Sequence, residues 1–261
     1  MVCRQVRLPR PVRGYRHDGK AQRDHRRFSG QGHCGGHLPD AQQLRRLPAD
    51  RHRRLLPLRA RAMIDKRDVQ SFFDRLAPGW DAELVRNEPV IAAILDNAGV
   101  QPGVRVLDVA CGTGVLFRDY TARQAGHVTA IDLSPEMAAR AAEKAAGTCI
   151  EVICGDVETD VQVQESAPYN VVMVYNAFPH FPDPAGLIRR LSGLLRPGGR
   201  LSIAHGMSRA ALDAHHSGSA HTVSMRLLPE EEVRALMAPY LDVDVVISDD
   251  RMYQVCGVKR A

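Results

Sequence analysis

Two spacings of apolar residues alternate along the chain after Met63 and indicate its secondary structure. Short runs of consecutive apolar residues predict buried strands, whereas apolar residues three and four positions apart predict helices that bury one face. The predicted strands cover 105–110, 127–131, 150–153, 169–175 and 200–204, and the predicted helices cover 65–76, 88–98, 115–123, 135–146 and 184–195. This alternation favours a parallel sheet with helices on both faces.

The C-terminal part of the chain follows a different pattern. Residues 206–228 are rich in His and Ser and keep no period, so we expect an irregular insertion there. Residues 229–238 predict a helix, and 243–247 and 251–258 predict two strands joined by a turn short enough to make an antiparallel hairpin. The predicted fold is therefore an α/β, Rossmann-like, doubly wound, seven-stranded and mostly parallel sheet with a C-terminal antiparallel hairpin.

Charge divides the sequence at Met63. Residues 1–62 contain 15 Arg and 1 Lys against 4 Asp and no Glu, a net charge of +12, whereas the remainder carries −7. Because 1–62 keeps no helical or strand period, we expect a disordered Arg-rich extension there and a single domain in 63–261. The extension is either a basic arm for nucleic acid or anionic lipid, or translated upstream sequence ahead of a natural start at Met63; the second interpretation is favoured.

Cysteine usage and hydropathy indicate the compartment. The six cysteines form no C-x-x-C pair, so reduced thiols are the simpler interpretation. The chain contains neither an apolar run of about 18 residues, as a bilayer span needs, nor the hydrophobic core of a secretory signal. We therefore expect a cytoplasmic protein without a membrane partner.

The chemistry-bearing residues follow the first two predicted strands. The first strand contains Asp108 and ends in the turn Gly112-Thr113-Gly114, where glycines let a ligand approach the backbone. The second ends in Asp132, where a carboxylate can accept hydrogen bonds from ribose hydroxyls. A dinucleotide site would place a third glycine where Phe117 stands. An NAD(P)-dependent oxidoreductase is therefore disfavoured and remains the alternative.

Four segments together resemble the motifs of class I S-adenosylmethionine (SAM)-dependent methyltransferases. They are Leu-Asp-Val-Ala-Cys-Gly-Thr-Gly at 107–114, Thr-Ala-Ile-Asp-Leu-Ser-Pro-Glu-Met at 129–137, Cys-Gly-Asp-Val at 154–157 and Leu-Leu-Arg-Pro-Gly-Gly-Arg-Leu at 194–201. They occur in the family's order and at suitable spacing, and the resemblance covers about residues 104–204. It implies SAM as cofactor and methyl transfer to an oxygen, sulfur or carbon nucleophile of a small-molecule acceptor.

The resemblance implies a binding place for each end of the cofactor. Gly112, Thr113 and Gly114 would hold its methionine part, with Asp108 near the amino group. Asn176, which follows the strand at 169–175, would line the same amino-acid end.

The adenosine end is assigned in the same way. Asp132 would bind the ribose, and Leu133 and Met137 would flank the adenine ring. Asp156 and Val157 would meet the adenine edge. From the residues alone, an Asp after a strand is also a common helix cap and a helical Met is also ordinary packing, so those interpretations stay open.

Three regions are expected around the acceptor, because ligands of open α/β sheets bind at the carboxyl ends of the strands. They are the aromatic residues of 72–80, the segment 175–180 and the loop after 204. His180 and His205 follow strand ends and are the candidate catalytic bases. The insertion at 206–228 would cover the acceptor pocket as a lid.

A metal site is not predicted. His215 and His216 are adjacent and cannot share a helix face, and no acidic partner recurs at a ligand spacing near His205 or His221.

A small-molecule acceptor is favoured over nucleic acid. Residues 176–179 read Asn-Ala-Phe-Pro, not the Asn/Asp-Pro-Pro-Tyr/Phe signature of amino-methylating nucleic-acid enzymes, and the chain has no Pro-Cys dipeptide. Residues 72–81 loosely resemble the N-terminal element of quinone-biosynthesis and other small-molecule methyltransferases. A non-catalytic SAM- or nucleic-acid-binding protein that uses the basic arm is the second alternative.

Overall fold

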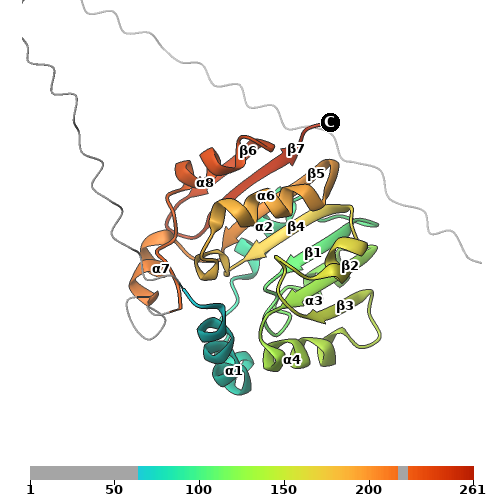
Figure 1. Ribbon diagram of the computed structural model, residues 1–261, viewed down its shortest axis with the longest axis vertical. Coiled ribbons are helices and arrows are strands. Elements are labelled where there is room, and N and C mark those ends of the chain that lie inside the picture. The colour runs from blue at the N-terminus through green and yellow to red at the C-terminus, as the bar shows by residue number, and fades with distance from the viewer. Residues whose placement is uncertain (1–63, 217–222) are drawn as a thin grey trace, which may run out of the picture. The chain divides into compact units, whose positions relative to one another are not determined.

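The computed structural model describes residues 64–216 and 223–261 and places a seven-stranded sheet at their centre (Figure 1). The strand order is β3-β2-β1-β4-β5-β7-β6. The strands are β1 (Arg105–Val109), β2 (His127–Asp132), β3 (Ile150–Cys154), β4 (Tyr169–Tyr175), β5 (Leu195–His205), β6 (Leu241–Ser248) and β7 (Tyr253–Lys259). Strands β1 to β5 pair in parallel, and β7 is antiparallel to both β5 and β6. The predicted fold class is confirmed.

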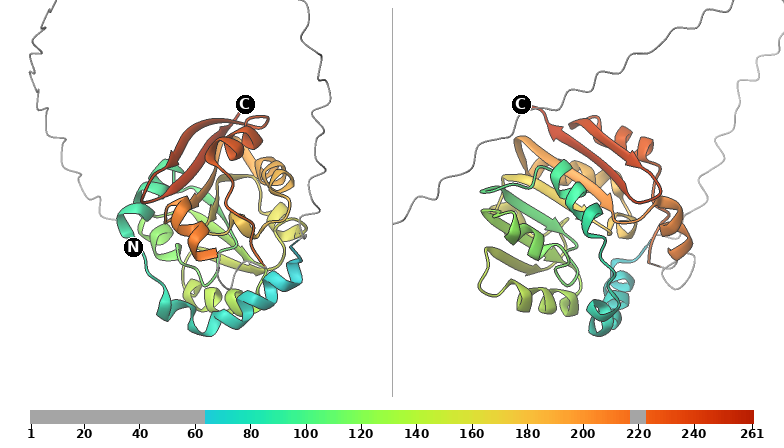
Figure 2. Two further views of the ribbon diagram at one scale, coloured as in Figure 1. Left: turned by 90° about the vertical axis from the view of Figure 1, so that its left-hand side faces the viewer. Right: turned by 180° about the vertical axis from the view of Figure 1, so that it is seen from behind.

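Helices cover both faces of this sheet, as the continuous burial of β1, β2 and β4 requires. Helices α5 (Val161–Glu165), α6 (Pro184–Leu194) and α8 (Glu230–Met237) contribute to the core on one face. Helices α2 (Glu88–Asn97), α3 (Phe117–Ala122) and α4 (Pro135–Ala145) contribute to the core on the other. Figure 1 looks onto the face with α6, and the right-hand view of Figure 2 shows the opposite face with α2 and α3.

The side chains of successive β1 residues lie in the hydrophobic cores on opposite faces of the sheet. Leu107 and Val109 pack with α6, whereas Val106 packs with α2. Because both faces are buried, the strand has no polar face, which is why the strands read as continuous apolar runs in the sequence.

The first helix is longer than the sequence predicts. We expected it to end near Leu76 because Pro78 and Gly79 follow, but α1 (Lys66–Glu83) continues through both residues. Side-chain contacts on both sides of the proline hold the helix together. Ala77 is buried, the rings of Phe73 and Trp80 meet edge to face within the helix, and Asp81 bonds to Thr113 and Lys144. These contacts outweigh the disruption that an interior proline causes.

Two further helices lie where the sequence predicts none. Helix α5 forms in the polar stretch before β4, because Asp160 Oδ1 accepts hydrogen bonds from the Gln162 and Val163 amides and Val163 is buried. Helix α7 (Arg209–His216) forms inside the segment expected to be irregular. Its Leu212 side chain is buried against the core of β5 and α8.

Some predictions lie outside the described residues. These are the extension 1–62 and its proposed binding role, and His221; the side chains of His215 and His216 are likewise outside what is described. Across 64–216 and 223–261, none of the helices is both long and apolar enough to span a membrane.

Candidate functional site

The turn after β1 lies at the carboxyl edge of the sheet and contains two glycines, Gly112 and Gly114. Its backbone is left-handed at Ala110 (φ 54°), Gly112 (φ 56°) and Gly114 (φ 83°). A Cβ on Gly114 would lie 2.6 Å from the Phe117 ring, so this position requires glycine for both its backbone angle and its space. Gly112 is half-buried and has open space where a Cβ would stand, so a ligand can approach the backbone there without an intervening side chain.

Asp132 joins this turn to the end of β2. Its Oδ2 accepts a hydrogen bond of 2.8 Å from the Gly112 amide, and its Oδ1 accepts one of 2.9 Å from the Ser134 amide. Burial raises the pKa of Asp132, although both backbone bonds favour the charged form. Each carboxylate oxygen keeps a second lone pair, so the group can also accept bonds from a pair of ligand hydroxyls.

Asp108 is a buried carboxyl group with unmet hydrogen-bonding capacity. Its side chain is 2% exposed, and Oδ2 accepts no hydrogen bond from the residues that the structure describes. Burial, together with the negative charge of Asp132, raises the pKa of Asp108 to about 8, while the Tyr120 hydroxyl opposes the shift. A cationic ligand group at Oδ2 would both satisfy the oxygen and restore its charge.

The other predicted adenosine contacts gather at the ends of β2 and β3. Asp132 lies beside Cys154 in the parallel register, and Asp156 follows two residues later. Leu133 is half-buried, whereas Met137 and Val157 are buried. The structure thus brings the set together, although Met137 and Val157 have little exposed surface.

Helix α1 crosses the ends of β1, β2 and β3, which the sequence did not predict. Lys66 Nζ bonds to Asp156 Oδ2 at 2.6 Å and also pairs with Glu158, both after β3. Asp74 Oδ1 accepts from the Ser134 hydroxyl after β2. In the helix's last turn, Asp81 accepts from Thr113 after β1.

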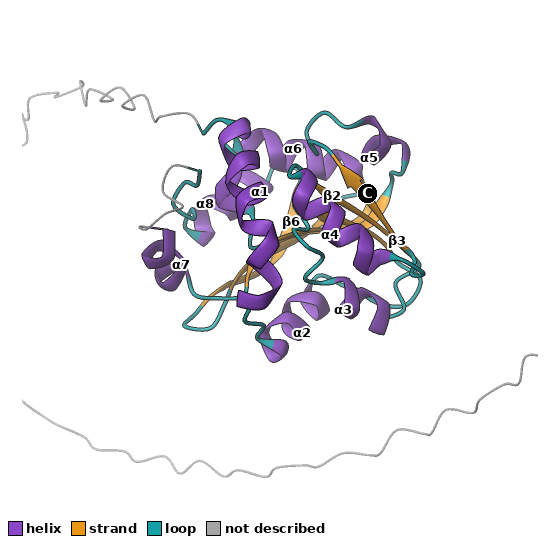
Figure 3. Cartoon of the chain, turned by 90° about the horizontal axis from the view of Figure 1, so that it is seen from below, coloured by secondary structure: helices purple, strands orange, loops and turns teal. Residues whose placement is uncertain are grey.

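These anchors place α1 beside α4, as Figure 3 shows. All three are polar residues of an otherwise ordinary amphipathic helix. Their partners are distant in sequence, so the hydrophobic period carries no sign of them.

Asn176 and His180 follow β4 at the carboxyl edge of the sheet. Asn176 adopts a left-handed φ of 55°, and its Oδ1 accepts from the Gly206 amide at 2.9 Å. The 3₁₀ turn Phe178–His180 comes next. His180 Nδ1 lies 2.9 Å from the Val223 carbonyl oxygen, which only accepts, so Nδ1 carries the proton. In the neutral ring Nε2 is then the basic atom.

His180 and His205 differ in their surroundings. The ring of His180 meets the ring of Phe73 from α1 edge to face at 5.0 Å between centroids, and the side chain is half-buried. His205 is fully buried and its ring faces Tyr253 of β7 at 6.1 Å. His180 therefore keeps some exposed surface, whereas His205 is enclosed in the core.

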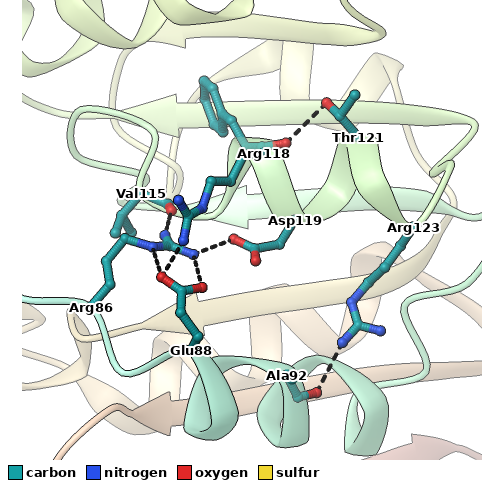
Figure 4. A network of polar contacts seen from close by, with 9 residues as sticks. Arg86, Glu88, Ala92, Val115, Arg118, Asp119, Thr121 and Arg123 are labelled. Atoms are coloured by element: carbon teal, nitrogen blue, oxygen red, sulfur yellow. Dashed lines mark hydrogen bonds and ion pairs between the residues drawn. The ribbon is translucent and has the colours of Figure 1, made fainter.

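A charged network fixes the segment before α2 to the start of α3 (Figure 4). Arg86 bonds to Asp119 at 2.7 Å, to both oxygens of Glu88 and to the Val115 carbonyl oxygen. Hydrogen bonds from Arg86 and Arg118 lower the pKa of Glu88 to about 2. The network supports the helix that leaves the turn after β1, and sequence reasoning missed it because its members follow no motif.

Comparison with known proteins shows which proteins this chain resembles in sequence and fold. Residues 106–199 match the family model of a methyltransferase domain. The fold is that of the class I SAM-dependent methyltransferases, and the resemblance seen in the four motifs is confirmed.

One similar curated relative is the ubiquinone biosynthesis O-methyltransferase of Xylella fastidiosa (strain 9a5c). It is 40% identical over 103 residues, which are 39% of this chain. The chain spans 41% of the length of this relative.

Two solved structures share the fold. The N-methyltransferase NodS from Bradyrhizobium japonicum WM9, solved with S-adenosylhomocysteine (SAH), has a TM-score of 0.58 at 13% identity, covering 74% of this chain and 98% of its own. The magnesium protoporphyrin IX methyltransferase from Synechocystis PCC 6803, solved with SAM, has a TM-score of 0.56 at 17% identity, covering 77% and 100%.

Proposed function

We propose that this protein is a SAM-dependent methyltransferase that acts on a small-molecule acceptor. The observation that carries the proposal is the arrangement at the ends of β1 and β2. Asp132 bonds to the Gly112 amide there, and the unpartnered oxygen of Asp108 lies in the same region. Asp108, Gly112 and Asp132 all lie within residues 106–199, the segment that matches the family model of a methyltransferase domain.

The residues present fit the chemistry of the cofactor. A positively charged amino group suits the buried carboxyl of Asp108, and ribose hydroxyls suit Asp132. The accessible backbone at Gly112 suits the methionine chain, and Asn176 would line the same end. SAM supplies an electrophilic methyl group on a sulfonium, so the protein must align the acceptor and exclude water.

The adenine is assigned to the ends of β2 and β3. Leu133 and Met137 would flank the ring, and Asp156 and Val157 would meet its edge. Asp156 Oδ1 already accepts from the Glu158 amide at 3.0 Å, and Oδ2 bonds to Lys66. An amino group of adenine would use a remaining lone pair of this carboxylate.

His180 is the proposed proton acceptor. Its Nδ1–H bond to Val223 fixes the ring so that Nε2 can take a proton from an acceptor hydroxyl as that oxygen bonds to the methyl group. The acceptor loses a proton to His180 and gains the methyl group. We prefer an oxygen nucleophile because the relative from Xylella fastidiosa is named an O-methyltransferase. We assign the role to His180 and not to His205 because His205 is fully buried.

The two alternatives have weaker support. An NAD(P)-dependent oxidoreductase would need room at the turn, but the Phe117 ring fills the space beside Gly114. A nucleic-acid-associated role would use residues 1–62, which are not described. The comparisons favour neither alternative.

The test is methyl transfer by the full chain. The protein is incubated with methyl-labelled SAM and a panel of phenols, thiols and quinone precursors, and products are detected by mass spectrometry. The proposal predicts label on one acceptor class, with SAH released in equal amount. Absence of transfer from SAM to every acceptor, combined with oxidation of NADH, would overturn it.

A further inference from the structure

Two side chains from distant parts of the chain, Asp81 and Lys144, contact the Thr113 hydroxyl. Thr113 Oγ1 donates to Asp81 Oδ1 at 2.6 Å and accepts from Lys144 Nζ at 3.1 Å. Lys144 Nζ in turn lies 2.7 Å from Asp81 Oδ2. Asp81 belongs to the end of α1 and Lys144 to the last turn of α4. The turn after β1 is thus held from two helices at once.

Thr113 is the residue of 112–114 whose own side chain can hold this turn, in addition to the bond from the Gly112 amide to Asp132. Its neighbours Gly112 and Gly114 have no side chains and adopt left-handed backbone. Glycine loses more conformational freedom on folding than any other residue, so a turn of this kind needs restraint from outside. Thr113 is completely buried, and both of its hydroxyl contacts involve charged groups, which form the stronger hydrogen bonds.

The charge state of the pair supports this restraint at neutral pH. Partial burial opposes ionisation of Asp81, but hydrogen bonds from Lys144 and Thr113 and the charge of Arg140 lower the pKa of Asp81 below its usual value. The side chains of Asp81 and Lys144 are 44% and 39% exposed. Salt should therefore screen their mutual attraction, whereas the buried hydroxyl of Thr113 remains shielded.

We infer that Asp81 and Lys144 are positioning residues for the cofactor: by holding the Thr113 hydroxyl, they keep Gly112–Gly114 in the conformation that receives the methionine part. This inference rests on the proposed function of the turn. The pair acts through Thr113 and makes no contact with the reacting atoms.

The experiment uses the full chain with Asp81→Asn, Lys144→Met and the double variant. The matched control is Asp242→Asn, which breaks the Asp242–Arg260 ion pair of the same 2.7 Å length at β6. Each variant is titrated with SAH by calorimetry, and hydrogen exchange is followed at the amides of the turn and of α6. Steady-state kcat and the KM for SAM are measured once an acceptor is known.

We expect each single variant to bind SAH roughly 10-fold more weakly, as loss of a charge-assisted hydrogen bond implies. The double variant should be little weaker than either single variant, because the two changes break one network. Exchange at 112–114 should accelerate while exchange in α6 stays unchanged. KM for SAM should rise with little change in kcat. The difference in SAH affinity between each variant and the native protein should become smaller at high salt, because salt weakens the Asp81–Lys144 attraction in the native protein.

Two results would overturn the inference. One is unchanged exchange at 112–114 in all three variants, and the other is an equal loss of SAH affinity in Asp242→Asn. Failure of the native protein to bind SAM or SAH would instead contradict the proposed function. In that case the exchange rates still decide whether Asp81 and Lys144 hold the turn.

Discussion

The Gly112 amide donates to Asp132 Oδ2 over 2.8 Å, so the turn after β1 and the carboxylate at the end of β2 form one unit. The second oxygen of the carboxylate accepts from the Ser134 amide. Asp132 therefore supports the shape of the site as well as offering lone pairs to a ligand.

Replacement of Asp132 should reveal both roles. Asp132→Ala leaves two amide donors without their acceptor and should destabilise the protein by about 1–3 kcal/mol. Asp132→Asn keeps one acceptor oxygen and should destabilise less. Urea unfolding measures this stability, and calorimetry measures SAH binding, which both variants should weaken. Native affinity in Asp132→Ala would contradict the assignment.

Glycine substitutions separate backbone strain from crowding. Gly147 has a φ of 76° with open space around it, whereas Gly114 has a φ of 83° and faces Phe117. Gly147→Ala should cost about 1–2 kcal/mol of folding stability, the usual cost of left-handed alanine. Gly114→Ala should cost clearly more and abolish SAH binding. Equal unfolding free energies for the two variants would show that the Phe117 ring moves aside with no loss of folding stability.

The buried carboxyl of Asp108 predicts a pH dependence. Its pKa is about 8 in the folded protein against 3.8 ordinarily, so the folded state holds a proton that the unfolded state releases. The contribution of Asp108 to folding stability should therefore be fully present below the ordinary pKa and decline as the pH rises toward about 8. Asp108→Asn should flatten this decline.

The measurement is urea unfolding of the ligand-free protein at several pH values. Affinity for SAH should rise over the same pH range, because its amino group favours the ionised carboxylate. Equal slopes in the native protein and Asp108→Asn would contradict the buried, protonated state.

His180 can be tested with two amide substitutions. Asn can keep a donor near Nδ1 for the Val223 carbonyl but removes the basic Nε2, so His180→Asn should fold normally and bind SAH normally. Its turnover on a hydroxyl acceptor should fall by about 10²- to 10⁴-fold. His180→Gln should lose turnover and also loosen the segment around Val223. A His180→Asn variant with full turnover would exclude His180 as the base.

The sequence predicted the elements whose burial follows a simple period. Strands β1 to β4 and helices α2, α4 and α6 are found close to their predicted bounds, because each buries an apolar face or both faces. The short turn between the last two strands predicted correctly that β7 runs antiparallel to β6. Helix α1 extends past Pro78, and beyond the proline Asp81 makes tertiary contacts with Thr113 and Lys144, which no local rule contains.

The sequence predicted the residues of the candidate site that belong to recognisable motifs, and it did not predict the others. Asp132 and the glycine turn lie together because parallel strands bring their carboxyl ends to one edge. The contacts of Lys66 and Asp81 with the same edge depend on partners 90 and 32 residues away. Side-chain pairs at such separations leave no periodic signal in one sequence.

The central claim is tested most directly by calorimetric titration of the full chain with SAM and SAH, with Asp132→Ala as the control. The account predicts that both ligands bind near one equivalent per chain and that the variant binds them much more weakly. If neither ligand binds while NADH does, the methyltransferase proposal is wrong.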